Sequence, residues 1–190
     1  MYDTFETLVV TWPASCVLHV QLNRPTKRNA MDAKFWVEFR QCFELIAAED
    51  SDVRAVVVSG MGKCFPAAVR SVRSDKSDHF SAGLDLADTT NFDSIGKATP
   101  DVARRAFRYR KLALAMQESF SAIERCPQPV IAAIHGACVG GAVDLACACD
   151  IRMCSDDTRF CIAEVKVGLA ADVGTLQRMP KVRKVDSHKM

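Results

Sequence analysis

The chain has 190 residues, which indicates one domain or one large domain short of a piece, and nearly half of them are hydrophobic, which is enough apolar material for a buried core. The formal charge of +2 is too small to indicate binding to nucleic acid or to a membrane surface, and Lys and Arg are spread through the chain. No apolar run approaches the roughly 20 residues that a membrane span needs. The acidic, polar N-terminal residues and the C-terminal Ser187–Met190 predict no readable targeting signal.

Nine cysteines raise the possibility of a metal site or of disulfides. However, no C-x-x-C pair occurs, and the four histidines show no metal-ligand spacing with the cysteines. We therefore predict reduced, buried thiols and no metal. Most of the cysteines lie within apolar stretches, namely Cys16, Cys42, Cys126, Cys138, Cys147 and Cys149.

The N-terminal third predicts two strands around one helix. Cys16–Asn23 alternates apolar and polar residues and then meets Pro25, which is typical of a strand and a turn. From Met31 to Ala48 the apolar residues recur at helical spacing. Val53–Ser59 is β-branched and nearly continuous, which predicts a buried strand.

The middle of the chain predicts a long helix followed by a strand. The helix should run from about Asp101 to Arg125, with Thr99 as its N-cap and Pro100 at its first position. Val130–His135 is the next predicted strand.

After Gly140 and Gly141 we predict a short apolar helix to about Cys149, then short strands at Ile151–Cys154 and Phe160–Ile162. This order of elements predicts an α/β domain in which helices pack on sheets. Two stretches, Pro66–Phe80 and Lys181–Met190, are polar and lack periodicity. We expect a loop in the first and a frayed terminus in the second.

The strongest local signal for chemistry is a strand, a glycine turn and a helix that begins near Gly141. Free N–H groups at such a helix start suit a phosphate or a carbonyl oxygen that becomes negative. Tight packing of strand on helix is the alternative reason for the glycines. Asp144 follows within the first helical turn, in an apolar setting where a carboxylate is costly unless it is paired or functional. Stabilisation of the helix N-terminus is the alternative role.

Glu164 and Asp172 add two acids in a mostly apolar stretch. Three carboxylates near one oxyanion site would suit proton transfer at carbon. Alternatively, Asp172 caps a last helix over Val173–Arg178. The turn Ser81–Leu86 offers a second set of backbone N–H groups.

Together these segments resemble the crotonase (enoyl-CoA hydratase/isomerase) family, and within it the dienoyl-CoA isomerases. The resemblance implies an α/β spiral of ββα units that binds acyl-CoA without a metal or other cofactor, since the CoA thioester is the substrate. It follows the family's order through nearly the whole chain. The segments that carry it are Leu22–Met31, Arg54–Gly60, Ala82–Leu86, Glu124–Gly136, Val139–Leu145 and Glu164–Arg178.

The resemblance also implies roles for individual residues. Backbone N–H groups of Leu84 and Gly141 correspond to those that hold the thioester oxygen in the family. The segment that lies along the CoA corresponds to Ala82, Gly83, Leu84, Asp85 and Leu86.

The acids distinguish reactions within the family. Hydratases carry two glutamates at the positions of Asp144 and Glu164, and glycine at that of Asp172. The set of Asp144, Glu164 and Asp172 instead matches isomerases that convert 3,5-dienoyl-CoA to 2,4-dienoyl-CoA in fatty acid β-oxidation. By resemblance, Asp172 removes the C2 proton, Glu164 returns a proton at C6, and Asp144 supports them.

Several departures from the family pattern shape the expectations. Ala142 replaces a glycine, Pro66–Phe80 resembles an insertion, and the pattern stops near Pro180. We therefore expect a core over residues 1–180 with an inserted loop at 66–80, a non-family tail at 181–190, and no C-terminal helical region. An inactive or unstable truncated form that acts as a binding partner is the alternative.

The resemblance further implies an acyl-CoA partner and no nucleic acid. Family members form trimers and hexamers, but the departures make assembly of this chain doubtful. The family occurs in the mitochondrial matrix and in peroxisomes.

Overall fold

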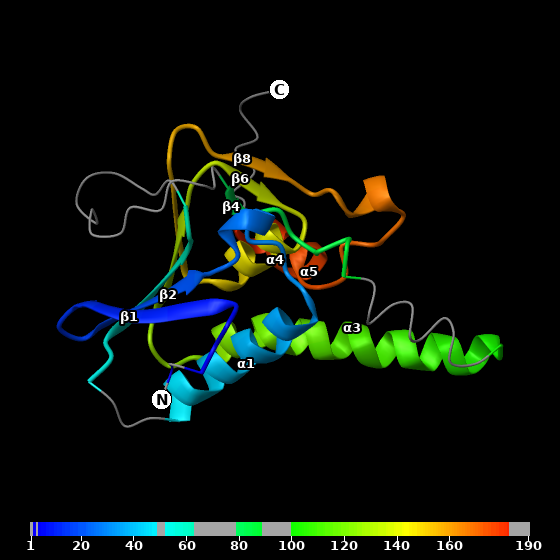
Figure 1. The fold of residues 1–190 in the computed structure, drawn as a ribbon, viewed down its shortest axis with the longest axis horizontal. Coiled ribbons are helices and arrows are strands. Elements are labelled where there is room, and N and C mark those ends of the chain that lie inside the picture. The colour runs from blue at the N-terminus through cyan, green and yellow to red at the C-terminus, as the bar shows by residue number, and fades with distance from the viewer. Residues whose placement is uncertain (1, 3, 49–51, 63–78, 89–99, 183–190) are drawn as a thin grey trace.

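The structure is a computed structural model of the chain, and it describes residues 2, 4–48, 52–62, 79–88 and 100–182. The predicted α/β class is confirmed: helices pack against two sheets (Figure 1). Most of the predicted loop at 66–80 lies outside the described residues, as do residues 183–190 of the predicted tail. None of the described helices is long and apolar enough to cross a membrane.

The larger sheet has five strands in the order β1-β2-β3-β5-β7. Its first pair is antiparallel and the other pairs are parallel. The three predicted strands at 16–23, 53–59 and 130–135 form its centre, whereas β1 is an edge strand that the sequence patterns did not indicate. The bounds are Leu8–Ala14 for β1, Val17–Leu22 for β2, Ala55–Gly60 for β3, Val130–Ile134 for β5 and Ile151–Cys154 for β7.

The smaller sheet has three parallel strands in the order β4-β6-β8. Each of its strands follows a strand of the larger sheet along the chain, so that β3 leads to β4, β5 to β6 and β7 to β8. With the helices between them these pairs form the predicted succession of ββα units. The bounds are His79–Ser81 for β4, Ala137–Val139 for β6 and Arg159–Cys161 for β8. The predicted loop at 66–80 is therefore wrong at its end, because His79 and Phe80 belong to β4, the strand that pairs with β6.

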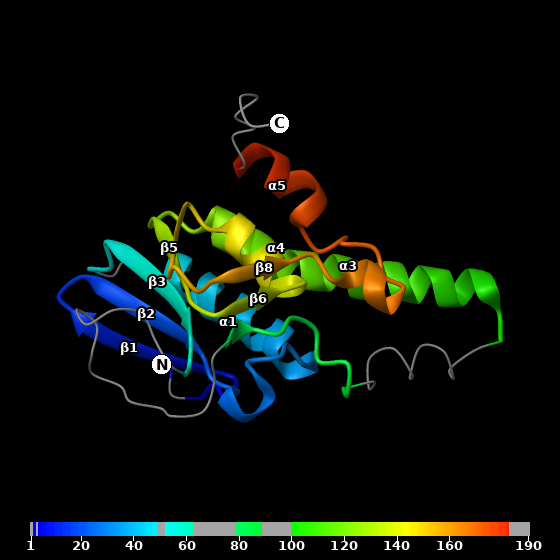
Figure 2. The same cartoon turned by 90° about the horizontal axis from the view of Figure 1, so that it is seen from above.

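Within the described residues four α-helices accompany the sheets, and α1 packs against α3 along one side of the larger sheet (Figures 1 and 2). Two short 3-10 turns, η1 and η3, cover Pro25–Lys27 and Glu164–Val167. The helix bounds are Ala33–Ala48 for α1, Val102–Arg125 for α3, Gly141–Ala148 for α4 and Thr175–Val182 for α5.

Two predicted helix boundaries are wrong. The N-cap of α3 is Asp101, not Thr99, because the Asp101 carboxylate accepts the Arg104 N–H at 3.0 Å. An aspartate at this position also places negative charge at the positive end of the helix. At the C-terminus, α5 begins at Thr175 and continues through Val182, so two residues of the predicted tail are helical.

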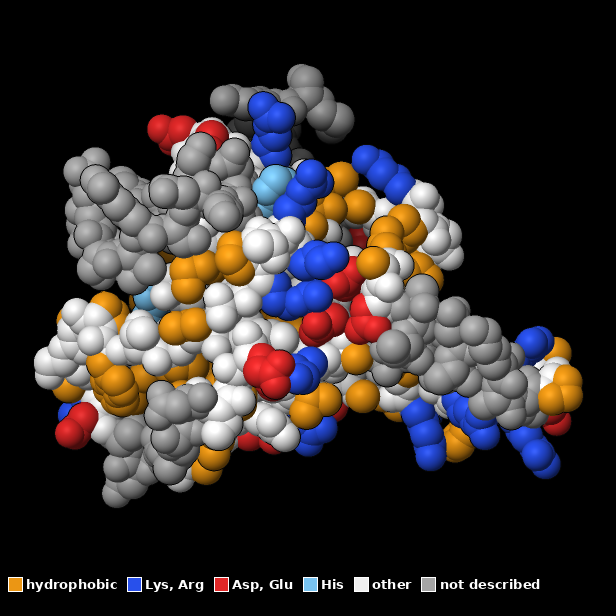
Figure 3. Space-filling model, viewed as in Figure 1, with side chains coloured by type: hydrophobic (Ala, Val, Ile, Leu, Met, Phe, Trp, Pro, Cys, Tyr) orange, Lys and Arg blue, Asp and Glu red, His pale blue; other side chains and the backbone are white. Residues whose placement is uncertain are grey.

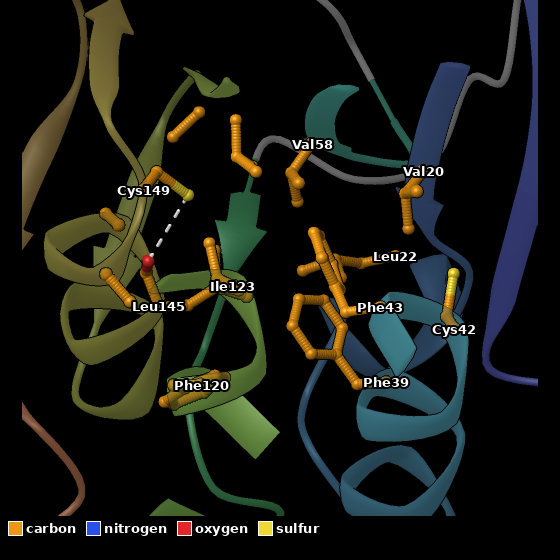
Figure 4. Packing of buried hydrophobic residues seen from close by; sticks show 14 of the residues in the cluster. Val20, Leu22, Phe39, Cys42, Phe43, Val58, Phe120, Ile123, Leu145 and Cys149 are labelled. Atoms are coloured by element: carbon orange, nitrogen blue, oxygen red, sulfur yellow. Dashed lines mark hydrogen bonds between the residues drawn. The ribbon is translucent and has the colours of Figure 1, made fainter. Parts of the chain in front are cut away.

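The core is an aromatic cluster between α1, α3 and the larger sheet (Figure 4). The Phe120 ring of α3 lies 5.3 Å from the Trp36 ring and 5.9 Å from the Phe39 ring of α1, measured between centroids. The Phe39 and Phe43 rings lie 5.0 Å apart. Such offset and edge contacts add to the free energy of burial. The same cluster continues through Ile123 and Leu145 to α4, so one core supports both the sheet and the shorter helix.

The eight cysteines that the structure describes are free thiols, and four of them are buried. Burial raises the pKa of Cys42 to about 12, so this thiol stays neutral in the core. Cys16 and Cys126 are only partly buried, and Cys154 is exposed. The prediction of unpaired thiols therefore agrees with the described residues, whereas uniform burial is wrong.

We predict that Phe120→Ala lowers the free energy of unfolding by about 3–5 kcal/mol, because the fully buried ring leaves a cavity between α1 and α3. Phe107→Ala on the same helix is the matched control, since that ring is 56% exposed and its loss should cost less than about 1 kcal/mol. Urea unfolding followed by circular dichroism measures both. Equal losses would contradict the packing described.

Candidate functional site

The turn after β4 is fixed by a parallel bridge between Met31 and Leu84. The Met31 N–H donates to the Gly83 carbonyl at 2.8 Å, and the Asp85 N–H donates to the Met31 carbonyl at 2.9 Å. This pairing uses the groups on either side of Leu84, so the N–H of Leu84 points away from Met31. The donor expected at Leu84 is thus left out of the bridge.

The second expected donor is at the start of α4. Gly140 has φ 54° and ψ −123°, a conformation that L-residues rarely adopt, and its N–H donates to the Cys161 carbonyl at 2.8 Å. Gly141 is the first helical residue, so its N–H has no acceptor within the helix. The helix dipole adds partial positive charge at this point.

Gly83 brings these two donors together. A β-carbon on Gly83 would lie 2.5 Å from the Val139 carbonyl oxygen and 3.2 Å from the Gly141 nitrogen. The turn after β4 and the start of α4 are therefore in direct backbone contact. Gly141 is also enclosed, because a β-carbon there would lie 3.2 Å from Met31 Sδ.

Asn29 supports this contact, a role that the sequence analysis missed. Its side-chain amide donates to the carbonyls of Met61, His79 and Phe80 at 3.0–3.1 Å. Its own carbonyl accepts the Ser81 hydroxyl at 2.7 Å. Asn29 has φ 52° and is buried, and asparagine is among the few residues that adopt this conformation readily. The local sequence gives no signal for this role, because the partners His79 and Phe80 lie 50 or more residues away.

A cavity of about 530 Å³ opens beside the two donors. Its walls are mostly apolar and come from α1, α3, the turn after β4, the start of α4 and residues 163–173. The lining includes all three acids singled out from the sequence, Asp144, Glu164 and Asp172. Apolar lining residues include Trp36, Leu84, Leu86, Tyr109, Leu112, Met116, Val139, Val167 and Leu169.

Asp144 is the most buried of these acids, with 1% of its surface exposed. Burial raises the pKa of Asp144, nearby Glu164 raises it further, and hydrogen bonding from Thr175 together with the Arg178 charge acts in the opposite direction. The Thr175 N–H at the start of α5 donates to Asp144 Oδ1. Asp144 therefore accepts a hydrogen bond at the start of α5 and also lines the cavity.

Glu164 lines the same cavity and lies close to the start of α4. Its Oε1 would lie 3.1 Å from a β-carbon on Gly140. Its Oε2 is buried and accepts no hydrogen bond from the described residues. A buried carboxylate oxygen of this kind is suited to exchange a proton with a bound molecule.

Asp172 lies on the exposed rim of the cavity and is fixed through its backbone. The Gln117 side chain of α3 donates to the Asp172 carbonyl at 2.7 Å. Because α5 begins at Thr175, Asp172 is not its N-cap, and the alternative of a purely capping role is wrong. The carboxylate is thus left available at the cavity.

The expected CoA segment divides into two groups. Ala82, Leu84 and Leu86 line the cavity together with Gly141. Gly83 does not line the cavity, because it packs against the backbone of Val139 and Gly141. The Asp85 carboxylate forms an ion pair with Arg24 at 2.9 Å. Ala142, which replaces the family glycine, is fully buried in the core. Within the described ranges no three His, Cys, Asp or Glu side chains cluster as metal ligands would.

Arg178 is a second residue that the sequence analysis missed. The residue is 6% exposed, and its guanidinium donates to Glu124 Oε2 at 2.7 Å and to the Ser121 hydroxyl at 3.2 Å and lies beside Asp144 and Gly174. It joins α5 to α3 and supplies positive charge next to the buried acid. A lone arginine in an amphipathic helix gives no sequence signal for this role.

We predict that Gly83→Ala lowers the free energy of unfolding by at least about 2 kcal/mol, through a positive φ of 79° and a clash with the Val139 carbonyl. Gly168→Ala is the matched control. Gly168 has nearly the same φ, 74°, but open space around its α-carbon, so only the backbone cost of about 1 kcal/mol applies. Thermal or urea unfolding compares the two, and equal losses would refute the close contact.

We predict a pH-dependent effect of Asp144→Asn. Because the pKa of Asp144 is raised above 3.8 in the folded chain, the native state holds this proton more tightly than the unfolded state. The unchanged protein therefore loses stability as pH rises from about 4 through the raised pKa, whereas the variant does not. The free energy of unfolding of the variant should increase relative to the unchanged protein as pH rises above about 4. A constant difference would contradict this.

The comparisons with known proteins agree with this geometry. The model of the enoyl-CoA hydratase/isomerase family matches residues 13–71 and 72–187. The mitochondrial Delta(3,5)-Delta(2,4)-dienoyl-CoA isomerase of Homo sapiens is 51% identical over 179 residues, covering 94% of this chain and 49% of that protein. The peroxisomal isomerase of Arabidopsis thaliana is 39% identical, covering 95% of this chain and 59% of that protein. The chain thus spans about half the length of the human relative.

A solved structure gives the same result for the fold. A putative enoyl-CoA hydratase from Thermobifida fusca YX, in complex with CoA, superposes with a TM-score of 0.69 at 27% identity, covering 92% of this chain and 59% of that one. With a family model that matches most of its length and a fold of successive ββα units, the chain belongs to the enoyl-CoA hydratase/isomerase family.

Proposed function

We propose that the chain isomerises 3,5-dienoyl-CoA thioesters to 2,4-dienoyl-CoA thioesters, a reaction of fatty acid β-oxidation. One observation carries the proposal. Three carboxyl groups line one mostly apolar cavity beside the backbone N–H groups of Leu84 and Gly141: Asp144 from α4, Glu164 from η3 and Asp172 from the turn before α5. The named isomerases among the relatives support the same reaction.

In this proposal the two N–H groups hold the thioester carbonyl oxygen. Removal of a proton from C2 places negative charge on that oxygen, and donors already fixed by the backbone stabilise it without reorganisation. The contact of Gly83 with Val139 and Gly141 keeps the two donors in register. A substrate bound against the mostly apolar walls displaces water from them, which strengthens these electrostatic interactions.

The acids then move one proton out and one proton in. Asp172 accepts the C2 proton, the resulting electron pair is delocalised over the thioester and the diene, and Glu164 donates a proton at C6. The two double bonds thereby move into conjugation with the thioester, and no electrons are gained or lost overall. Asp144, buried next to the Gly141 donor, supports the pair by holding the start of α5 through Thr175.

No metal or redox group takes part in this proposal, because the fixed donors and the acids supply the charge stabilisation and the proton transfer. The compartment that we propose is the mitochondrial matrix or the peroxisome. The human relative is named as mitochondrial and the Arabidopsis relative as peroxisomal.

The activity is tested with a synthetic 3,5-dienoyl-CoA and the ultraviolet absorbance of the conjugated product. Asp172→Asn should lower kcat by at least about 100-fold, because a general base typically contributes that much. Asp156→Asn, an exposed acid in the turn between β7 and β8, is the matched control and should keep full activity. Product formation no faster with the unchanged chain than with Asp172→Asn would refute the proposal.

A further inference from the structure

The small net charge of the chain conceals a strong local concentration of positive charge. The first half of α3, residues 102–114, carries five basic side chains and no acidic one. Since the chain has 25 basic and 23 acidic residues, the remainder has 20 basic against 23 acidic residues. Lys and Arg occur throughout the chain, but five of the 25 lie within this one stretch. The basic side chains are Arg104, Arg105, Arg108, Arg110 and Lys111.

This half of α3 projects beyond the rest of the described chain in both ribbon views (Figures 1 and 2). Lys and Arg side chains follow its outer edge, with hydrophobic atoms between them (Figure 3). Four of the five basic side chains are exposed, and only Arg105 is partly buried. The charge thus faces solvent and is not used to pair with the core.

Helical spacing sorts the outer side chains into one face. At about 100° per residue, Phe107 and Leu114 fall on nearly the same line, opposite the buried Met116 and Phe120. Arg110 flanks this line on one side, and Arg104 and Lys111 flank it on the other. Phe107 is 56% exposed and Leu114 is 42% exposed. We call Arg104, Phe107, Arg110, Lys111 and Leu114 the basic face of α3.

We propose that the basic face of α3 binds the surface of a membrane that contains anionic phospholipids. Cations on both sides of an apolar line match an interface in which headgroup phosphates lie above acyl chains. A nucleic acid fits less well, because its phosphates would lie against Phe107 and Leu114 and leave those side chains without an apolar partner. The Lys111 ammonium, 4.9 Å from the centroid of the Phe107 ring, shows that charge and apolar surface already share one patch.

The opposite face of the same helix lines the cavity through Tyr109, Leu112 and Met116. A helix is about 10 Å across, so binding through the basic face holds the cavity within about that distance of the lipid surface. A substrate with a long acyl chain could then reach the cavity from the membrane. The binding itself is independent of the proposed isomerase activity.

Flotation of the purified full chain with lipid vesicles tests the proposal. Vesicles of phosphatidylcholine alone are compared with vesicles that also contain phosphatidylserine, at low and at high salt. We expect binding only to the anionic vesicles at low salt, because salt screens exposed charges. Each Lys or Arg near such a surface is worth about fivefold in binding, so Arg104→Gln, Arg110→Gln and Lys111→Gln together should weaken it at least tenfold.

The matched control removes three positive charges elsewhere, with Arg40→Gln, Arg125→Gln and Arg159→Gln, and should retain most of the binding. A second variant, Phe107→Ser with Leu114→Ser, keeps every charge and should also weaken binding, whereas pure electrostatic attraction would leave it unchanged. Circular dichroism verifies that each variant folds. Three results would overturn the proposal. They are no binding to anionic vesicles, equal losses in the two charge variants, or binding to single-stranded RNA that is tighter than binding to vesicles and is unchanged in the variant with Phe107→Ser and Leu114→Ser.

Discussion

Gly83 lies so close to the Val139 carbonyl that no side chain fits between the two backbones. This contact joins the turn after β4 to the start of α4. It thereby aligns the N–H of Leu84, which the bridge to Met31 leaves unused, with the N–H of Gly141, which the helix leaves unused. The side of the cavity formed by Leu84 and Gly141 therefore depends on this approach of one backbone to another.

The acids at the cavity illustrate how one fold can give carboxyl groups different properties. Asp144 is almost fully buried, and burial raises its pKa, while the Thr175 N–H and the Arg178 guanidinium limit the cost of ionising it. Asp172 lies on the exposed rim, and Glu164 has one carboxylate oxygen buried without a protein partner. Environments that differ in this way are the usual means by which a protein assigns separate acid and base roles. Arg178 also pairs with Glu124, so the same residue couples the buried acid to α3.

Sequence patterns predicted the parts of the fold that local residues determine. The β-branched run at β3 and the helical spacing in α1 and α3 are strong because packing on one continuous core imposes them. The three-residue strands β4 and β6 are too short to show periodicity, and each follows a strand of the larger sheet, β3 and β5 respectively, from which the chain passes into the smaller sheet. Gly141 and Asp144 were found for the same local reason, whereas Asn29 and Arg178 act across 50 or more residues of sequence. Contacts between residues so far apart in the sequence produce no local pattern of residue spacing.

Helix α3 has a C-terminal half that packs in the core and an N-terminal half that extends into solvent. Its C-terminal half is packed by Phe120 and Ile123 into the core, and this packing is what allows the other half to extend into solvent as a continuous helix. A solvated helix of three turns is marginal by itself, so anchoring at one end stabilises a surface that could not fold alone. One face of that extension closes the cavity, and the opposite face carries cations around Phe107 and Leu114. The net charge of the whole chain is a single sum over all residues. Composition alone therefore could not reveal the cavity-lining face of α3 or its basic face.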